Sequence, residues 1–444
     1  MWTVRKTMSE TQIGSTFRPD RSDTLGRYYT KRDIGTALVA HMTGLNPSRL
    51  LDLGSGSGSL SYAAVSRWKG LRLLTVDIDA GASRHLSMLL PKDGRHVHSH
   101  IQADALCSNL PTIIPSTFKR IDAGVCNPPF ITPTWRKGFS EILEDAGFSS
   151  CLPVLPEVNA ALLFLAQNLR VLSTQSTLGI ILPDTLVSGM KHEQFRRELL
   201  RRYCVRKVVR LPRRSFQGTD ALAHILILSK GSGTEDKIPL HLFKPTFSDD
   251  SIDSISIDVE QGIKRLDFLY HSQNVARYAR LPRTIELRQV CTDLSRGVLT
   301  AVEVRASRSN ALHTTDIACS WAGQWKRFPK SNKTLGGHRK KVEIQAGDIL
   351  MARVGRNLQQ KIVGVKAGGA AITDCLYRIR VPKPWRQHVL SELTSRKGQL
   401  WLESRIHGVS ARIISKTDLL AFPLRKLASL VPSGKINPKK NNYG

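Results

Sequence analysis

Residues Cys126 to Phe130, with the sequence CNPPF, directly follow an apolar run that begins at Ile121. Two successive prolines lack backbone N–H groups and fix φ, so they can continue neither a helix nor a central strand. The stretch therefore predicts a rigid turn at a strand end. Such a turn can present the carboxamide of Asn127, the carbonyl of Pro128 and the ring of Phe130 in one set geometry. An ordinary surface turn can have the same composition, so the residues upstream must decide.

A glycine-rich turn lies upstream of this stretch. Leu50 to Leu53 form an apolar run that predicts a buried strand, and Leu60 to Trp68 predict a helix. Between them lies the turn Gly54-Ser-Gly-Ser-Gly58, whose glycines let backbone N–H groups approach a ligand closely. The strand, turn and helix together are typical of a nucleotide-binding unit. No Gly-Lys-Ser/Thr follows, so the turn is not a P-loop.

Acidic residues end the next two predicted strands. Asp77 ends the run LRLLTVDI, where a carboxylate can accept hydrogen bonds from ribose hydroxyls. Asp104 ends the third strand, where it can receive an adenine amino group, and Asn127 ends the fourth. Each aspartate alone could be a helix N-cap. Ligands of open parallel sheets bind outside the carboxyl ends of the strands, so polar groups at successive strand ends predict a site there.

Bulk composition limits the class of protein. A chain of 444 residues predicts two or three domains, and no apolar run approaches the ~18 residues that cross a bilayer. The first 23 residues contain no apolar core like that of a secretion signal. The seven cysteines are scattered without a CxxC pair, which argues against a zinc ribbon and fits reduced thiols in the cytoplasm.

The charge balance is strongly basic. Lys and Arg number 66 against 36 Asp and Glu, for a formal net charge of +30. Such an excess repels itself unless a polyanion neutralises it, so nucleic acid is the expected partner. A solubilising surface or an anionic membrane surface is the alternative interpretation.

In motif order, the sequence resembles the gamma class of N6-adenine DNA methyltransferases, which use S-adenosylmethionine. The resemblance covers residues 24 to 230 and rests on these stretches: GRYYT (26–30), LDLGSGSGSL (51–60), VDID (76–79), QADAL (102–106), NPPF (127–130), LGIILPDTLVSG (178–189) and RLPRRSFQGTDALAHILILSK (210–230). The chain departs from the family pattern in two places. Lys31 stands where the family usually has proline, and Ala105 stands where a bulky residue often packs on the cofactor adenine.

The resemblance implies an α/β, Rossmann-like methyltransferase domain that binds S-adenosylmethionine. The residues that it assigns to the cofactor are Thr30, Asp52, Gly54, Gly56, Asp77 and Asp104. Asn127 and the Pro128 carbonyl would accept the two hydrogens of the adenine N6 group and make that nitrogen more nucleophilic. Phe130 and Phe216 would stack on the adenine after it leaves the duplex. For Phe216, an ordinary place in the core is the alternative.

Similar Asn-Pro-Pro-aromatic turns serve enzymes that methylate guanine in ribosomal RNA or a glutamine side chain, so the rest of the chain must indicate the substrate. The stretch GSGTEDK predicts a linker, and the phrases AGDILMARVGR (346–356) and GVSARIISKTDLLAFPL (408–424) resemble target-recognition domains of restriction-modification proteins. An unrelated α/β accessory domain is the alternative. The expected organisation is an N-terminal arm (1–23), a methyltransferase domain (24–232), an α/β target-recognition domain (240–430) and a basic, disordered tail (431–444).

The basic segment 325–341 mixes aromatic residues, glycines and cations, which suits a loop that meets a phosphate backbone. Its predicted DNA-binding residues are Lys326, Arg327, Arg339 and Lys340; a solvated charge run is the alternative. We expect double-stranded DNA as the partner, a separate restriction nuclease or defence-system subunit as a candidate partner, and no membrane. The alternating His96, His98 and His100 lack converging ligands, so no metal site is predicted. An RNA methyltransferase and a catalytically silent DNA-recognition subunit remain the competing functions.

Overall fold

The computed structural model describes residues 31–151, 158–216, 219–231, 233–243, 253–280, 284–306, 311–330, 341–408 and 412–426. The chain divides into two compact units. Unit 1 comprises the residues up to Phe268 together with Gly408–Ser410, and unit 2 comprises Leu269–His407 together with the residues from Ala411 on. Thr30, the N-terminal arm, Arg339, Lys340 and the C-terminal tail lie outside the described residues. Among the described residues, no helix is long and apolar enough to cross a membrane.

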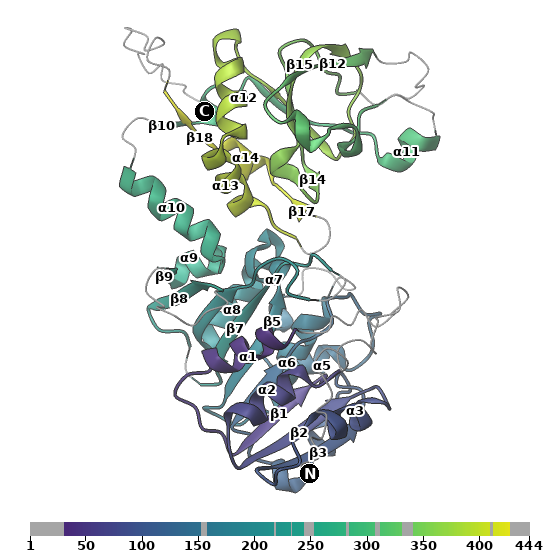
Figure 1. The fold of residues 1–444 in the computed structure, drawn as a ribbon, viewed down its shortest axis with the longest axis vertical. Helices are drawn as coiled ribbons and strands as arrows, with labels where there is room; N and C mark the ends of the chain where they lie inside the picture. Colours follow the sequence, from purple (N-terminus) through teal and green to yellow (C-terminus); the bar gives the residue numbers. More distant parts are fainter. Residues whose placement is uncertain are drawn as a thin grey trace, which may run out of the picture. The chain divides into compact units, whose positions relative to one another are not determined.

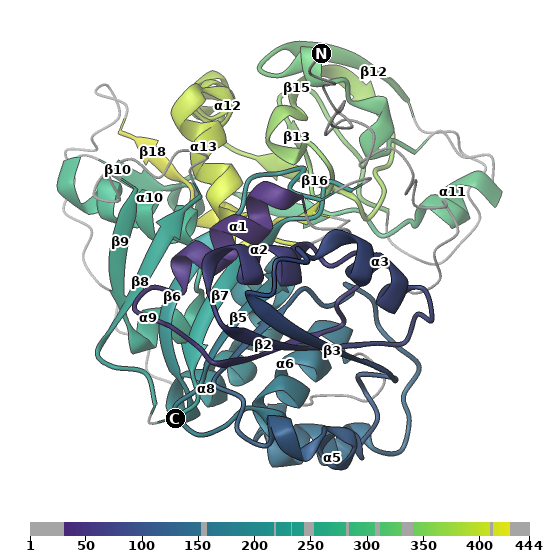
Figure 2. The ribbon, with the colours of Figure 1, turned by 60° about the horizontal axis from the view of Figure 1, so that its bottom comes forward.

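Unit 1 is built on a mixed sheet with the strand order β3-β2-β1-β4-β5-β7-β6-β8-β9. The strands are β1 (Arg49–Leu53), β2 (Leu71–Asp77), β3 (His96–Gln102), β4 (Ala123–Cys126), β5 (Thr177–Pro183), β6 (Cys204–Arg210), β7 (Ala223–Ser229), β8 (Lys237–Leu242) and β9 (Ser254–Asp258). Strands β1 to β5 pair in parallel, and β7 is antiparallel to both β5 and β6. The order β8, β6, β7, β5 can be followed in Figure 2.

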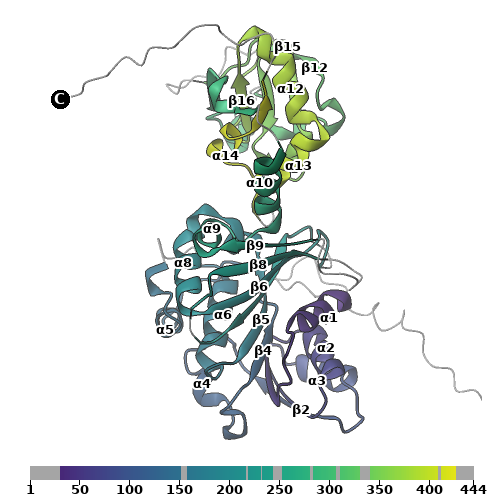
Figure 3. The ribbon, with the colours of Figure 1, turned by 90° about the vertical axis from the view of Figure 1, so that its left-hand side faces the viewer.

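Helices cover both faces of this sheet, with α1, α2 and α3 on one face and α4, α5, α6 and α8 on the other (Figure 3). The helices of unit 1 are α1 (Arg32–His41), α2 (Ser59–Arg67), α3 (Ala82–Leu89), α4 (Leu110–Ile113), α5 (Phe139–Asp145), α6 (Ala160–Val171), α7 (Asp184–Ser188), α8 (Glu193–Arg202) and α9 (Val259–Lys264). Because both faces are covered, every residue of β5 and β7 is buried. Their nearly continuous apolar sequences follow from this position.

The predicted linker GSGTEDK does not separate the two units. Strand β8 pairs in parallel with β6, and β9 pairs antiparallel with β8, so residues beyond the linker extend the sheet of unit 1. The boundary between the units lies between Phe268 and Leu269, inside helix α10 (Phe268–Arg280). The short polar stretch resembles a linker in sequence because it is an exposed connection between two strands of one sheet.

Buried charges tie β6 and β7 to their neighbours in unit 1. Arg210 of β6 donates two hydrogen bonds to Asp267, at 2.7 and 2.8 Å, with both side chains buried. His224 of β7 lies 3.0 Å from Asp184, at the start of α7. Burial alone would raise the pKa of Asp184, but the hydrogen bond and charge of His224 lower it to about 2. The buried side chains of Arg210 and His224 thus each contact an aspartate.

Unit 2 contains a second sheet, with the order β11-β16-β13-β15-β12, and helices that pack beside it (Figure 1). Its strands are β10 (Thr284–Glu286), β11 (Asp293–Arg296), β12 (Trp325–Lys330), β13 (Ile349–Ala352), β14 (Val354–Gly355), β15 (Ile362–Gly369), β16 (Leu376–Arg380), β17 (Arg412–Ile413) and β18 (Pro423–Arg425). Its helices are α11 (Ala301–Ala306), α12 (Arg386–Thr394), α13 (Arg396–Arg405) and α14 (Lys416–Leu420). Buried side chains of β13, β15 and β16 form its core with Trp401 and Phe422.

The first part of the predicted basic loop 325–341 is a strand. Trp325–Lys330 form β12, at the edge of the second sheet and parallel to β15. The ammonium of Lys326 lies 5.4 Å from the ring centre of Trp321, and Arg327 is exposed. The first part of this segment is therefore an edge strand, and it carries both aromatic and basic side chains.

Candidate cofactor and methyl-transfer site

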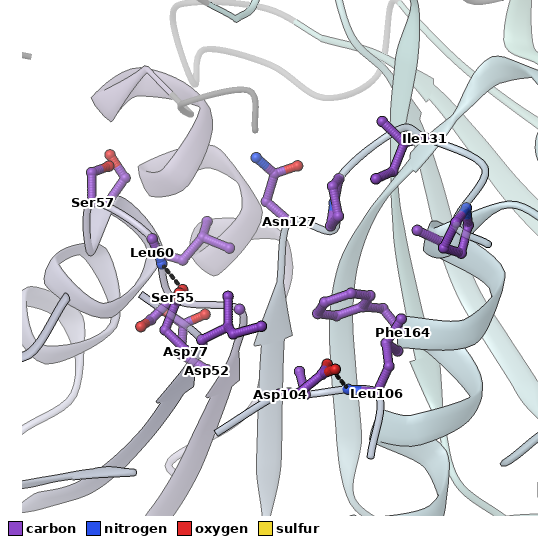
Figure 4. A pocket seen from close by; sticks show the side chains of 18 of the residues that line it. Asp52, Ser55, Ser57, Leu60, Asp77, Asp104, Leu106, Asn127, Ile131 and Phe164 are labelled. Atoms are coloured by element: carbon purple, nitrogen blue, oxygen red, sulfur yellow. Dashed lines mark hydrogen bonds between the residues drawn. The ribbon is translucent and has the colours of Figure 1, made fainter. Parts of the chain in front are cut away.

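A cavity of about 410 Å³ opens at the carboxyl ends of the parallel strands of unit 1. Residues from the ends of β1, β2, β3 and β4 line it, among them Asp52, Asp77, Asp104 and Asn127. Figure 4 shows Ser55 and Ser57 on one side of the cavity, Asp104 and Phe164 on the other, and Asn127 between them. The position agrees with the rule that open α/β sheets bind ligands beyond the carboxyl ends of their strands.

The glycine turn between β1 and α2 takes a backbone conformation that other residues rarely adopt. Gly54 has φ +77°, and a Cβ atom there would lie 2.9 Å from Cε1 of Phe164. Gly56 has φ +50°, and a Cβ atom on it would meet nothing within 4 Å. Gly54 is therefore required by close packing against Phe164, whereas Gly56 leaves its side of the cavity open.

Asp77 holds the glycine turn in place. Its carboxylate accepts hydrogen bonds from the backbone N–H of Gly56 at 2.7 Å and of Asp79 at 2.9 Å. The side chain is 6% exposed and borders the cavity. Each carboxylate oxygen can accept more than one hydrogen bond, so Asp77 can hold the turn and still accept donors from a ligand.

Asp52 is a buried carboxylate, and one of its oxygens can accept a hydrogen bond from a ligand. It is 1% exposed, and its Oδ2 accepts a hydrogen bond of 2.6 Å from the Ser61 hydroxyl. Within the described residues, its Oδ1 has no hydrogen-bond partner. Burial, with a smaller contribution from the charge of Asp77, raises the pKa of Asp52 to about 7. A cationic or hydrogen-bonding ligand group would stabilise the ionised form.

Asp104 lies on the opposite side of the cavity. Its Oδ1 accepts a hydrogen bond of 2.8 Å from the backbone N–H of Leu106, and its Oδ2 lies 2.7 Å from a guanidinium nitrogen of Arg136. The buried Gln167 of α6 fixes the loop that follows, because its amide donates to the carbonyls of Ala105 and Cys107. Helix α6 thus holds the loop that follows this carboxylate.

The NPPF turn extends from β4 between these two groups of acids. The Cys126 thiol donates to the Leu53 carbonyl at 3.1 Å, and the backbone N–H of Ala160 donates to the Ile131 carbonyl at 2.8 Å. These contacts fix both ends of the turn to β1 and α6. Asn127 and Pro129 border the cavity, and Pro128 is buried. The predicted turn is therefore present, with its carboxamide at the site.

The rings of Phe130 and Phe216 lie edge to face, with centroids 5.9 Å apart and an interplanar angle of 79°. Phe130 is half-buried, whereas Phe216 is 2% exposed and belongs to the apolar core of unit 1. Phe130 can therefore offer an accessible ring surface. Phe216 supports that ring from within the core, and its stacking on a base stays a prediction.

Several lining residues were not identified from the sequence. Phe164 and Arg136 both border the cavity, as do Ile78, Leu106 and Ile131. Phe164 lies within the apolar run AALLFLAQ, where nothing distinguishes it from a core residue. Arg136 lies in the exposed-looking stretch TWRKG. Ile78 is 53% exposed and directly follows Asp77, and its place within the stretch VDID could have indicated it.

Comparison with known proteins identifies the protein family of this chain. The model of the family described as N-6 DNA Methylase matches residues 13–281. The chain belongs to this family. The matched residues contain the glycine turn, the three aspartates and the NPPF turn, and so include the motif residues that line the cavity. The membership implies a methyl donor.

Individual relatives are distant. A putative type II restriction enzyme and methyltransferase of Methanocaldococcus jannaschii is 28% identical over 89 residues, which cover 20% of this chain and 8% of the relative. The crystal structure of the type IIG restriction endonuclease BpuSI gives a TM-score of 0.51 at 12% identity and covers 92% of this chain and 60% of that one. A type I restriction-modification methyltransferase subunit from Streptococcus thermophilus gives 0.41 at 20% identity, covering 57% and 58%. The chain thus spans less than two thirds of each of these relatives, and the likeness to BpuSI shows a shared fold.

Proposed function

We propose that the protein transfers a methyl group from S-adenosylmethionine to the N6 amino group of an adenine in duplex DNA. The observation that carries the proposal is the cavity in which three carboxylates meet the NPPF turn. The family membership supports a DNA substrate over the RNA alternative. A catalytically silent subunit is disfavoured because Asp52, Asp77, Asp104 and Asn127 are all present at the cavity.

The three carboxylates fit this methyl donor. S-adenosylmethionine carries an ammonium group, a sulfonium, ribose hydroxyls and an adenine amino group, all of which are cations or hydrogen-bond donors. The cavity offers acceptors of matching charge: Asp52 has an open oxygen, and Asp77 and Asp104 border the cavity at the ends of β2 and β3. We assign Asp77 to the ribose hydroxyls and Asp104 to the adenine amino group. Thr30, which lies outside the described residues, stays a predicted contact of the methionine end.

The sulfonium of the donor supplies an already activated methyl group, so the protein needs no strong base. In our proposal, the Asn127 side-chain oxygen and the Pro128 carbonyl accept the two hydrogens of adenine N6. This would draw the nitrogen lone pair out of the ring and toward the methyl group; as the N–C bond formed, the S–C bond would break to leave S-adenosylhomocysteine, and one N6 proton would be lost to solvent. The two prolines hold these acceptors in a fixed direction before the base arrives, and such preorganisation is the main source of rate. Phe130 stacks on the base, and Phe216 supports the ring of Phe130 at 5.9 Å.

Unit 2 is our candidate for target recognition. It contains the phrases that resemble target-recognition domains, and the net charge of +30 favours a polyanionic partner. We propose that Lys326 and Arg327 on β12, with Arg339 and Lys340, contact DNA phosphates. The unit begins at Leu269 rather than at residue 240. Membership of a restriction-modification or phage-defence system, with a separate nuclease as partner, belongs to the same proposal.

Methylation-aware sequencing of DNA from cells that express the protein tests the function. We expect N6-methyladenine at one short sequence motif throughout the DNA. Cells that express Asn127→Ala at the same level should lack it. Unmodified DNA, or a modification that persists in the Asn127→Ala cells, would refute the proposal.

A further inference from the structure

Arg136 borders the cavity at the adenine end without belonging to any of the motifs that identify the family. It lies in the loop between the NPPF turn and helix α5, and its guanidinium nitrogen is 2.7 Å from Oδ2 of Asp104. The same guanidinium lies 4.9 Å from the ring centre of Phe139, whose ring also meets Trp135 edge to face at 5.5 Å. The arginine is thus held from two directions, by an ion pair and by an aromatic ring.

The neighbouring contacts determine what Arg136 can do to Asp104. Oδ1 accepts a hydrogen bond from the backbone N–H of Leu106, and Oδ2 receives the guanidinium. Each carboxylate oxygen has a second lone pair. One contact on each oxygen therefore fixes the carboxylate plane and leaves an acceptor position free on both. A carboxylate fixed in this way is preorganised for an amino group, since less freedom is lost when the ligand binds.

The small side chain next to Asp104 leaves room for such a contribution. Residue 105 is alanine, 5% exposed, and offers only a methyl group toward a ligand at this end of the cavity. The planar guanidinium of Arg136, which contacts the same carboxylate, is larger than the alanine methyl group. Planar cations stack well on aromatic rings.

We propose that Arg136 is a positioning residue for the adenine end of the cofactor: it aims the Asp104 carboxylate at the exocyclic amino group and adds a wall beside the purine. The inference rests on the proposed function, because it takes an adenine nucleoside as the ligand. The Arg136 side chain is 51% exposed and that of Asp104 31% exposed, so water screens the pair. The expected effect is therefore several-fold and confined to cofactor binding.

Calorimetric titration of the full chain with S-adenosylhomocysteine tests the proposal without requiring turnover. Arg136→Gln should raise the Kd by roughly fivefold, as expected for the loss of a half-exposed ion pair. Arg136→Lys, which keeps the charge, should recover part of the affinity. Lys137→Gln is the matched control, because it removes an exposed cation from the same loop at a residue that does not line the cavity. It should leave the Kd unchanged.

A double-mutant cycle with Asp104→Asn separates positioning from a general effect of the loop. If Arg136 acts through Asp104, adding Arg136→Gln to Asp104→Asn should change the Kd by less than about twofold. With methyl transfer to DNA as a second readout, Arg136→Gln should raise the KM for the cofactor and leave kcat unchanged. Each variant should unfold at the same temperature as the wild type, which would show that its fold is kept.

The outcomes distinguish this inference from the function on which it rests. Suppose that Asp104→Asn weakens binding. The positioning role is then wrong if Arg136→Gln leaves the Kd unchanged or lower, or if it has its full effect in the Asp104→Asn background. If Asp104→Asn itself leaves the Kd unchanged, or if the wild type does not bind S-adenosylhomocysteine, the assignment of the cavity to the cofactor fails, and the role of Arg136 fails with it.

Discussion

Asp52 of unit 1 and Asp348 of unit 2 are both 1% exposed, and these two carboxylates are paired in different ways. In unit 2, Asp348 receives two hydrogen bonds from the Arg380 guanidinium, at 2.7 and 2.9 Å, and one from the backbone N–H of Gln345. In unit 1, Asp52 receives one from Ser61, and its other oxygen has no partner within the described residues. Asp52 borders a cavity, whereas Asp348, directly before β13, is bound by Arg380 at the end of β16.

The comparison shows that burial of an acid does not by itself indicate function. A buried charge with its hydrogen bonds satisfied maintains the fold, and a buried charge with an open acceptor at a cavity is available to a ligand. The ion pair also raises the pKa of Arg380, chiefly through its hydrogen bond to Asp348. The chemistry of the protein is therefore assigned to unit 1, and the charges of unit 2 to structure and to the proposed contact with DNA.

The largest effect should come from the NPPF turn. Asn127→Ala removes one of the two proposed acceptors of the N6 hydrogens, so the rate of methyl transfer should fall by about a thousandfold. Binding of S-adenosylhomocysteine and of DNA should change little. Single-turnover kinetics with preformed complexes isolates the chemical step. A rate near that of the wild type would rule out the clamp.

Asp77 should have the next largest effect. Asp77→Ala removes the proposed acceptor of the ribose hydroxyls and the carboxylate that holds Gly56, so the Kd for S-adenosylhomocysteine should rise by at least about tenfold. Asp79→Ala is the control, because its carboxylate accepts from Gly81 and does not line the cavity. Equal Kd values for the two variants in calorimetric titration would contradict the assignment.

The two buried acids should respond to substitution with opposite signs. Asp348→Asn leaves Arg380 without its charge partner and should lower the free energy of unfolding by roughly 2–3 kcal/mol. Asp52 ionises near its usual pKa of 3.8 when unfolded and near 7 when folded. Between these values the folded state holds the extra proton, so the contribution of Asp52 to the stability of the wild type should fall as the pH rises from 4 to 7.

Asp52→Asn cannot ionise and should lack this part of the pH dependence, so that above pH 7 it should be more stable than the wild type. Denaturant unfolding from pH 4 to pH 8 measures both variants. If Asp52→Asn and the wild type change in parallel with pH, the raised pKa is wrong. If Asp348→Asn is as stable as the wild type, the pair does not have the structural role assigned to it.

The smallest effect should come from the cations of unit 2. Neutralising Lys326 and Arg327 should weaken DNA binding and reduce the slope of log K against log salt by about 0.9 for each DNA phosphate that these cations no longer neutralise. The double substitution of Arg396 and Lys397, two exposed cations of α13, is the control for net charge. In this control variant, the slope of log K against log salt should stay at the wild-type value. Equal reductions in slope for both pairs would show that β12 makes no local contact with DNA.

The sequence was sufficient to predict the part of the site that follows strand ends. Strand β1, the glycine turn, Asp77, Asp104 and the NPPF turn each occupy the expected place, because a parallel sheet brings successive strand ends to one edge. The sequence could not predict Phe164 or Arg136. One belongs to a helix that is apolar throughout, and the other to a polar loop, so their position at the cavity depends on tertiary packing.

The domain boundary and the burial of Phe216 also depend on tertiary structure. Strands β8 and β9 follow a polar stretch that resembles a linker, and only their pairing with β6 shows that they extend the first sheet. Phe216 stands in a turn-like sequence, yet its ring is in the core beside Phe130. Local composition does not determine whether such a ring points inward.

The identity of the methylated product tests the central claim most directly. The protein is incubated with isotopically labelled S-adenosylmethionine and either duplex DNA or ribosomal RNA, and the nucleic acid is digested to nucleosides for mass spectrometry. We predict labelled N6-methyl-2′-deoxyadenosine from duplex DNA, no labelled nucleoside from the RNA, and loss of the DNA product with Asn127→Ala. Label in the RNA, at another position of a DNA base, or at an equal level with Asn127→Ala would contradict the account.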